Sequence, residues 1–239
     1  MALLTVDHVR VEFGGIVALA DLSFSIDAGR ICALIGPNGA GKTTLFNCVS
    51  RLYEPKEGRI EFDGHDLLAL PAHRIAHAGI SRTFQNLALF PALTVVQNVM
   101  VGAHSVGGSS RSNRVDALVL LQRLGLVDLA DHPAAGLPYG TLKRIEIARA
   151  LAARPRLLLL DEPAAGLTHS EVDELADLVR TIRADFDLTV LLVEHHMAMV
   201  MAISDQIVVL DFGSKIAEGA PEQIRDDPRV IEAYLGTPA

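Results

Sequence analysis

The sequence predicts an α/β protein in which a largely parallel sheet flanked by helices is joined to an N-terminal antiparallel β subdomain and a mainly helical subdomain. Three observations predict this class. Apolar and polar residues alternate over the first segment, residues 93–151 carry mainly helical patterns, and strand and helix patterns alternate from residue 157 onward. A chain of 239 residues is long enough to bury a sizeable core in a single unit.

Composition and charge argue against several classes of protein. The chain is 50% hydrophobic and 21% charged, so it is not expected to be disordered. Its aliphatic stretches, such as Leu157–Leu160, are far shorter than the roughly 18 residues of a membrane-spanning helix. No secretory signal is visible at Met1–Val11, so we expect a cytoplasmic protein. The net charge of −8 argues against a general nucleic-acid binder.

The N-terminal segments are predicted to form the antiparallel sheet. Alternating apolar residues from Leu4 to Phe13 indicate one strand, and Ser23–Ile26 indicates a second, shorter one. A further hairpin strand is expected at Gly58–Phe62, before the turn Asp63-Gly64.

The middle of the chain begins with a buried strand at Ile31–Ile35, which leads into a glycine-rich loop and then a helix through about Ser50. A helix is predicted at Pro71–Ala78, closed by Gly79, and a strand at Ile80–Phe84. Cys32 and Cys48 are too far apart for a Cys-x-x-Cys motif, so we expect both in the core.

The helical subdomain is predicted from Leu93 to about Leu151, interrupted by a loop at His104–Arg114 that is rich in Gly, Ser and Asn. After it, strands and helices alternate, as in a parallel sheet covered by helices. The expected elements are strand Leu157–Leu160, a helix from Ser170, strand Thr189–Val193, a helix near Met197, strand Ile207–Leu210 and terminal helices.

The loop after the first buried strand matches the pattern G-x-x-x-x-G-K-[ST], which predicts a P-loop NTPase (RecA-like) core. In such a loop, backbone N–H groups and the N-terminus of the following helix hold phosphates, the lysine neutralises them, and a hydroxyl reaches Mg²⁺. We therefore expect ATP and Mg²⁺ as ligands. The nucleotide-binding residues are Gly36, Pro37, Asn38, Gly39, Ala40, Gly41, Lys42, Thr43 and Thr44.

Two carboxylates, Asp161 and Glu162, follow four leucines and precede Pro163. They are expected at the C-terminal edge of a buried strand, where open α/β sheets bind ligands. Asp161 is predicted to coordinate Mg²⁺, and Glu162 to act as the base for the water that attacks the γ-phosphate. Taken without the phosphate loop, the pair is equally well explained as a strand that ends in a polar turn.

Through the order of these motifs, the chain resembles the nucleotide-binding subunits of ABC transporters over essentially its whole length. The resemblance implies one ABC nucleotide-binding domain over residues 1–239, with its helical signature subdomain at about 90–155. It implies an ATP hydrolase whose catalytic residues are Glu162, His195 and Gln85, and whose metal site uses Thr43, Gln85 and Asp161.

Three of the residues that match the family have little meaning by themselves. Phe13, before Gly14-Gly15, matches the aromatic residue that stacks on adenine, although a Phe in an alternating strand is more often part of the core. Gln85 matches the glutamine that senses Mg²⁺ and the attacking water, and His195 matches the histidine that touches the γ-phosphate.

The sequence departs from the family pattern in several places. Leu137-Pro138-Tyr139-Gly140-Thr141 replaces the usual signature L-S-G-G-Q, and Pro138 has neither a hydroxyl nor an N–H to offer. Thr168 occupies the place of an aspartate that contacts the second subunit, and His196 the place of another aspartate. These departures leave open an alternative in which the subunit binds ATP without hydrolysing it, which the intact Lys42, Glu162 and His195 oppose.

Within the family, several segments are similar to the branch that imports branched-chain amino acids, in particular to its G-type ATPase. They are Arg82-Thr83-Phe84-Gln85-Asn86, Leu93-Thr94-Val95, Asn98–Gly102, Asp161–Leu167 and the tail from Ile216 to Gly236. The segment His104–Arg114 is shorter than the insertion usual in that branch. An ATPase subunit does not touch the solute, so other amino acids, amides or urea stay open as substrates.

The resemblance implies partners and a location. It implies a second ABC ATPase subunit, identical or related, two transmembrane permeases and an extracytoplasmic solute-binding protein, with the chain on the cytoplasmic face of the cell membrane and no nucleic acid bound. A soluble ABC ATPase acting on nucleic acid or ribosomes is the alternative from another class. The acidic balance and the lack of a heptad run argue against it.

Overall fold

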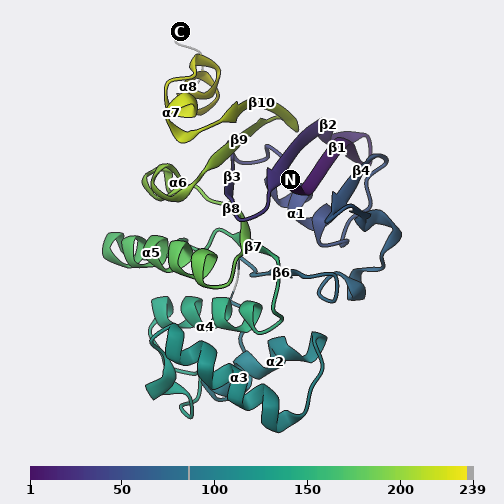
Figure 1. Cartoon of the computed structure of the whole chain (residues 1–239). Coiled ribbons are helices and arrows are strands. Elements are labelled where there is room, and N and C mark those ends of the chain that lie inside the picture. The colour runs from purple at the N-terminus through teal and green to yellow at the C-terminus, as the bar shows by residue number, and fades with distance from the viewer. Residues whose placement is uncertain (86, 236–239) are drawn as a thin grey trace.

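The computed structural model describes residues 1–85 and 87–235, so Asn86 and Gly236 of the quoted motifs lie outside the described residues. Two sheets form the framework of the molecule (Figure 1). The larger has six strands; β10 pairs antiparallel with β9, and every other pair of neighbouring strands is parallel. In spatial order these strands are β10 (Ser214–Gly219), β9 (Gln206–Asp211), β3 (Ile31–Ile35), β8 (Thr189–Val193), β7 (Leu157–Asp161) and β6 (Ile80–Arg82).

The smaller sheet is antiparallel and is built from the N-terminal segments, as predicted. In order its strands are β2 (Ile16–Asp27), β1 (Ala2–Phe13), β4 (Glu57–Phe62) and β5 (His65–Asp66). The strand expected at Ser23–Ile26 is longer than predicted, because β2 pairs with β1 along almost its whole length. Long-range pairing of this kind leaves only a weak local signal in the sequence.

Helix α1 (Lys42–Val49) lies between the two sheets (Figure 1). Its buried Leu45 and Phe46 belong to one apolar cluster with residues of β1, β2 and β4 on one side and of β3, β7 and β8 on the other. Cys32 and Cys48 lie in this cluster, as expected of core residues, and burial raises the pKa of the Cys48 thiol to about 12. The packing of α1 fixes the position of the loop that precedes it.

The opposite face of the larger sheet is covered by helices (Figure 1). Apolar side chains of α5 and α6 pack there, and two short C-terminal helices pack near β9 and β10. The helices are α5 (His169–Asp185), α6 (Met197–Ile203), α7 (Pro221–Arg225) and α8 (Pro228–Leu235). With both faces covered, the central strands are continuous runs of buried apolar residues.

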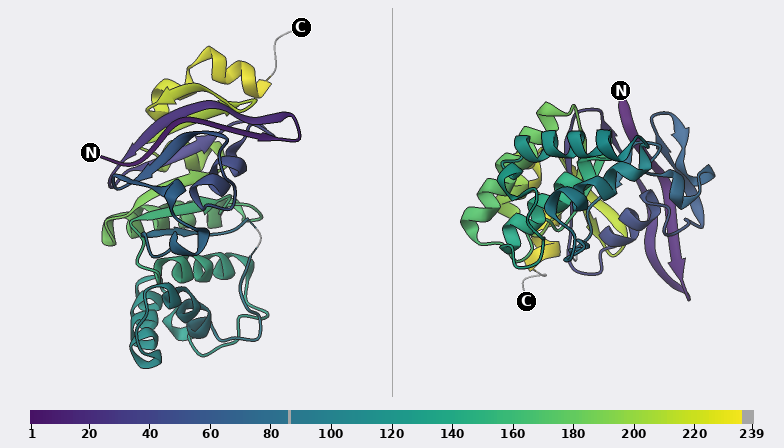
Figure 2. Two further views of the ribbon diagram at one scale, coloured as in Figure 1. Left: turned by 90° about the vertical axis from the view of Figure 1, so that its right-hand side faces the viewer. Right: turned by 90° about the horizontal axis from the view of Figure 1, so that it is seen from below.

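A layer of three helices lies beyond β6, at the far end of the molecule from α7 and α8 (Figures 1 and 2). These helices are α2 (Val95–Gly102), α3 (Ser110–Arg123) and α4 (Tyr139–Leu151). The expected loop at His104–Arg114 was wrong in its second half, because α3 starts at Ser110. The Ser109 hydroxyl accepts a hydrogen bond from the Ser112 N–H, so a serine that suggested a loop is the N-cap of this helix.

The helix predicted at Pro71–Ala78 was also wrong. A single 3₁₀ turn, Ala72–Arg74, stands there, and Ile75 is the one large apolar residue of the segment to be buried. A segment with so little apolar surface cannot stabilise a longer helix by packing. Other short 3₁₀ turns are Leu67–Ala69, Ala103–Ser105 and Val127–Leu129. In the part of the chain that the structure describes, no helix combines the length and hydropathy needed to span a bilayer.

Candidate functional site

The candidate site lies where β3, β7 and β8 end, at the carboxyl edge of the larger sheet. Each of these parallel strands leads directly into residues that the sequence singled out: the loop from Gly36, the pair Asp161-Glu162, and His195. A pocket of about 180 Å³ brings together the loop, Glu162 and His195, whereas Asp161 and Gln85 do not line it. Its lining residues are Ala18, Asn38, Gly39, Ala40, Gly41, Lys42, Thr43, Thr44, Glu162 and His195.

Two glycines of the loop, Gly36 and Gly41, are required by close packing against neighbouring strands. Gly36 has φ +148°, and a Cβ there would lie 2.1 Å from the carbonyl oxygen of Leu210 in β9. Gly41 has φ +103°, and its Cβ would lie 2.6 Å from the carbonyl oxygen of Ala18 in β2. A side chain at either position would displace a strand, so the loop conformation depends on glycine.

Lys42 is buried and folds back over the loop that precedes it. Its ammonium donates hydrogen bonds to the carbonyl oxygens of Gly36 (2.7 Å) and Pro37 (2.8 Å). Burial lowers the pKa of Lys42, and the nearby carboxylate of Glu162 partly opposes this shift. The positive charge of the loop therefore lies on the side of the pocket that faces Glu162.

Glu162 is held from two sides. The Gln85 side-chain amide donates to Oε2 (2.8 Å), and Nε2 of His195 donates to Oε1 (2.9 Å), since an ionised carboxylate can only accept. The backbone of Glu162 has φ +48°, a strained conformation for a residue other than glycine, and its N–H is bonded to the carbonyl of Val193 in β8. The three residues predicted as catalytic therefore form one hydrogen-bonded group.

Asp161, at the end of β7, is almost fully buried and forms an ion pair with Arg82 at 2.7 Å. Sequence reasoning missed this contact, because Arg82 stood out only as part of a motif shared with a branch of the family. The side chains predicted to hold Mg²⁺ are oxygen ligands: the Thr43 hydroxyl, the Asp161 carboxylate and the Gln85 amide oxygen. This set fits the ion, which is usually bound by one or two carboxylates together with substrate phosphates.

Glu194 is a second residue that sequence reasoning missed. It is buried and accepts three backbone hydrogen bonds, from the N–H groups of Ala164 (2.6 Å), His195 (2.8 Å) and His196 (3.1 Å). It thereby joins the loop after β7 to the loop after β8. A signal was available, because Glu194 directly follows a buried strand, just as Glu162 follows the last residue of β7.

Phe13 lies apart from the phosphate pocket, at the end of β1. Its ring is 45% exposed and meets Tyr53 edge to face, with ring centroids 5.0 Å apart. The core interpretation of this residue was therefore wrong, because the strand continues past the edge of the packed sheet. An exposed aromatic ring on that rim has a face available for stacking.

The signature segment forms the start of α4. Pro138 is the N-cap residue and provides no side-chain cap, and Tyr139 is exposed. The Tyr139 ring packs so closely on Gly166 that a Cβ there would lie 3.2 Å from it. The segment therefore meets the loop after Glu162 within the same chain.

The other departures from the family pattern have local explanations. Thr168 is the N-cap of α5 and forms a capping box with Glu171. His196 is the N-cap of α6, where its Nδ1 accepts from the N–H of Met199 (3.4 Å). Both residues stabilise helix starts, as the aspartates of the family pattern could also do.

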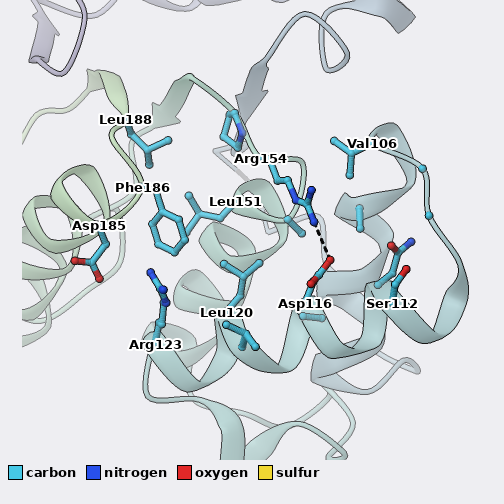
Figure 3. A pocket seen from close by; sticks show the side chains of 18 of the residues that line it. Val106, Ser112, Asp116, Leu120, Arg123, Leu151, Arg154, Asp185, Phe186 and Leu188 are labelled. Atoms are coloured by element: carbon cyan, nitrogen blue, oxygen red, sulfur yellow. Dashed lines mark hydrogen bonds and ion pairs between the residues drawn. The ribbon is translucent and has the colours of Figure 1, made fainter.

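A larger cavity, of about 750 Å³, lies away from the phosphate loop, between α3, the end of α4 and the end of α5 (Figure 3). Its floor includes Leu120, Leu151 and Phe186, and an exposed ion pair between Asp116 and Arg154 (2.9 Å) crosses its rim. None of the residues predicted for the site lines it. Size alone therefore does not identify the functional pocket of this chain.

The comparisons with known proteins agree with this geometry. Residues 19–165 match the family described as ABC transporter, and residues 214–239 match the one described as branched-chain amino acid ATP-binding cassette transporter. The chain is 43% identical to the high-affinity branched-chain amino acid transport ATP-binding protein BraF of Pseudomonas aeruginosa, with 98% of both chains covered. It is 41% identical to LivG of Escherichia coli, which has the same description and the same coverage.

A solved structure extends the similarity to the whole fold. The ADP conformation of an ATP-binding cassette of an ABC transporter superposes with a TM-score of 0.90 at 31% identity, covering 99% of this chain and 100% of the other. The predicted α/β fold of the P-loop NTPase type is thereby confirmed. The chain belongs to the ABC transporter family, as an ATP-binding cassette that hydrolyses ATP to serve a membrane transport complex.

Proposed function

We propose that this subunit couples binding and hydrolysis of MgATP to the import of branched-chain amino acids. The observation that carries the hydrolytic part is the position of Glu162, fixed between Gln85 and His195 in the same pocket as the phosphate loop. The transported solute rests on similarity, namely on relatives described as branched-chain amino acid transport proteins and on the matching segment 214–239.

The phosphate loop binds the triphosphate of ATP. Backbone N–H groups of the loop and the N-terminus of α1 face the anion, although Pro37 has no N–H to contribute, and the Lys42 ammonium, bonded to two loop carbonyls in this structure, moves to the outer phosphates. The exposed ring of Phe13 stacks on the adenine. Thr43, Asp161 and Gln85 hold Mg²⁺, which neutralises charge on the phosphates.

Glu162 acts as the general base for the attacking water. Its carboxylate keeps its orientation because both oxygens accept hydrogen bonds and because the backbone at φ +48° is fixed by the bond to β8. His195, which bonds to Glu162 through Nε2, contacts the γ-phosphate and orients the water. Gln85 lies on the segment after β6, directly after the exposed Phe84.

The transport complex contains a second ATPase subunit, two transmembrane permeases and an extracytoplasmic solute-binding protein, and it holds this chain at the cytoplasmic face of the membrane. Two ATP molecules bind between two ATPase subunits, each between the phosphate loop of one subunit and the start of α4 of the other. ATP favours the closed dimer because it binds that state more tightly than the open one, and hydrolysis releases it.

Uptake of labelled leucine by cells that depend on this subunit tests the proposal. Lys42→Ala removes the ammonium from the phosphate loop, so we expect uptake to fall to background and ATP binding by the purified subunit to be lost. Lys56→Ala, which removes an exposed lysine paired with Glu12, is the matched control and keeps both activities. Normal leucine uptake with loss of uptake of another solute overturns the substrate assignment. ATPase stimulation by nucleic acid instead of permease-containing membranes overturns the transport role.

A further inference from the structure

Arg82 occupies an unusual position for an arginine, because its side chain is only 9% exposed and lies beside the carboxylate of the proposed metal site. It is the last residue of β6, next to the strand β7 that ends in Asp161. The guanidinium is always ionised in proteins, so it is buried as a full positive charge. Such a charge is stable only when it is paired and hydrogen-bonded.

The guanidinium joins two elements of the site through its two terminal nitrogens. One of them, Nη2, donates to Oδ2 of Asp161 at 2.7 Å. The other, Nη1, donates to Oδ1 of Asn47 at 2.8 Å and to Oγ of Ser50 at 3.2 Å, in and just after α1. Because α1 begins at Lys42 and Thr43, Arg82 connects the helix of the phosphate loop to the strand that carries Asp161.

Two aromatic rings complete the surroundings of the guanidinium. The Cζ atom lies 5.4 Å from the ring centroid of Phe46 in α1 and 5.3 Å from that of Phe84. Both distances are in the range of favourable cation–π contacts. Phe84 directly precedes Gln85, so the same guanidinium also contacts the segment that carries the glutamine bonded to Glu162.

We propose that Arg82 is a positioning residue for the metal site. By donating a hydrogen bond to Oδ2, it fixes the rotamer of Asp161 and leaves Oδ1 to coordinate the metal or to accept a hydrogen bond from a water bound to it. Through Phe84 it also ties the position of this carboxylate to the segment of Gln85. The inference rests on the proposed function, because it concerns the Mg²⁺ that accompanies ATP.

The competing role for Arg82 is simple charge compensation, and the two roles predict opposite signs. If the guanidinium only neutralised Asp161, its removal would leave a free carboxylate and tighten Mg²⁺ binding. If it orients the carboxylate, its removal weakens Mg²⁺ binding, because side chains that hold metal ligands in place affect metal affinity about 10- to 100-fold.

Equilibrium binding of a fluorescent ATP analogue to the purified subunit separates these roles. It is measured first in EDTA and then as a titration with Mg²⁺. For Arg82→Gln we expect the Mg²⁺ concentration at half-saturation to rise at least about tenfold, with affinity in EDTA changed less than about twofold. Arg82→Lys keeps the charge without the planar fork and gives an intermediate shift.

Arg149→Gln is the matched control. Arg149 is also largely buried and donates to the carbonyl of Ala88 on the same loop, but it does not contact Asp161. We expect it to leave the Mg²⁺ half-saturation unchanged. If Arg82→Gln does not fold, as judged by thermal unfolding, Arg82→Lys carries the test by its own shift.

An unchanged or lower Mg²⁺ half-saturation in the Arg82 variants overturns the positioning role, and so does an equal loss of affinity in EDTA and in Mg²⁺. Either result leaves the proposed function intact as long as the wild-type subunit binds the analogue more tightly with Mg²⁺. If the wild type shows no Mg²⁺ dependence, the proposed metal site itself fails.

Discussion

The carboxyl edge of the larger sheet and the start of α4 differ in how they are held. At the sheet edge, Glu162, His195 and Gln85 are fixed by mutual hydrogen bonds, and Glu194 ties two of the loops together. At the start of α4, Pro138 offers neither a side-chain cap nor a backbone N–H, and Tyr139 is exposed. The first region is organised within the chain, whereas the second presents its first turn to the surface.

The two halves of the proposed ATP site should differ in how strongly they respond to amino-acid substitutions. Glu194 is buried and fully hydrogen-bonded, so its loss leaves backbone N–H groups unsatisfied. His195 and Gln85 are exposed, and they are held in place by their hydrogen bonds to Glu162. At the start of α4, Pro138 is exposed and makes no side-chain cap hydrogen bond, so its replacement breaks no hydrogen bond within the chain. We therefore expect the sheet edge to respond to substitution strongly, and the start of α4 mildly and in either direction.

The largest effect is expected for Glu162→Gln. The variant keeps the shape of the side chain but removes the base, so ATP hydrolysis falls at least about 100-fold while ATP stays bound. Phosphate release measures the first effect, and the elution volume of the subunit with MgATP measures the trapped dimer. If this variant hydrolysed ATP at the wild-type rate, Glu162 would not be the base. The hydrogen-bonded group of Glu162, Gln85 and His195 would then have no catalytic role.

Glu194→Gln tests whether the sheet edge depends on the joined loops. The amide replaces one of two oxygens that accept backbone N–H groups, so we expect the free energy of unfolding to fall by about 2 kcal/mol. Urea unfolding measures this effect. Glu174→Gln, on the exposed face of α5, is the control and should change it little. Equal stability of both variants would contradict the role assigned to Glu194.

Pro138→Ser tests the start of α4, because it restores the hydroxyl and the N–H of the usual signature. We expect ATP hydrolysis by the dimer to rise about fivefold, which corresponds to about 1 kcal/mol for one added hydrogen bond. Pro138→Ala restores the N–H alone and separates the two contributions. A fall in activity with serine would show that this chain uses the start of α4 in a different way.

The smallest effect concerns the buried middle of α4. Burial raises the pKa of Glu146 above its ordinary value of 4.5. The folded state then keeps a proton that the unfolded chain has lost, so the free energy of unfolding decreases as the pH rises from 4.5 through the raised pKa. Glu146→Gln lacks this group and should give a flatter curve. Urea unfolding between pH 4.5 and 7 measures the free energy of unfolding of both proteins. Parallel pH curves for the wild type and Glu146→Gln would contradict this prediction.

Much of the fold was predictable because it rests on local patterns. The buried strands β3, β7 and β8 are short continuous apolar runs, and the strand at Ile31–Ile35 and the one at Thr189–Val193 have the predicted bounds. The errors fell on segments where a local pattern competes with packing, as at Pro71–Ala78 and Ser110. The phosphate loop was predictable because all of its residues are consecutive.

The sequence by itself determined that this chain has a phosphate-binding loop between a buried strand and a helix, and a carboxylate pair at the end of another strand. The tertiary structure decided that Arg82 meets Asp161 and that Glu194 holds Ala164. These contacts join residues 79 and 30 positions apart. The physical reason is that periodicity and capping act over a few residues, whereas contacts at a sheet edge depend on strand order, which local patterns do not encode.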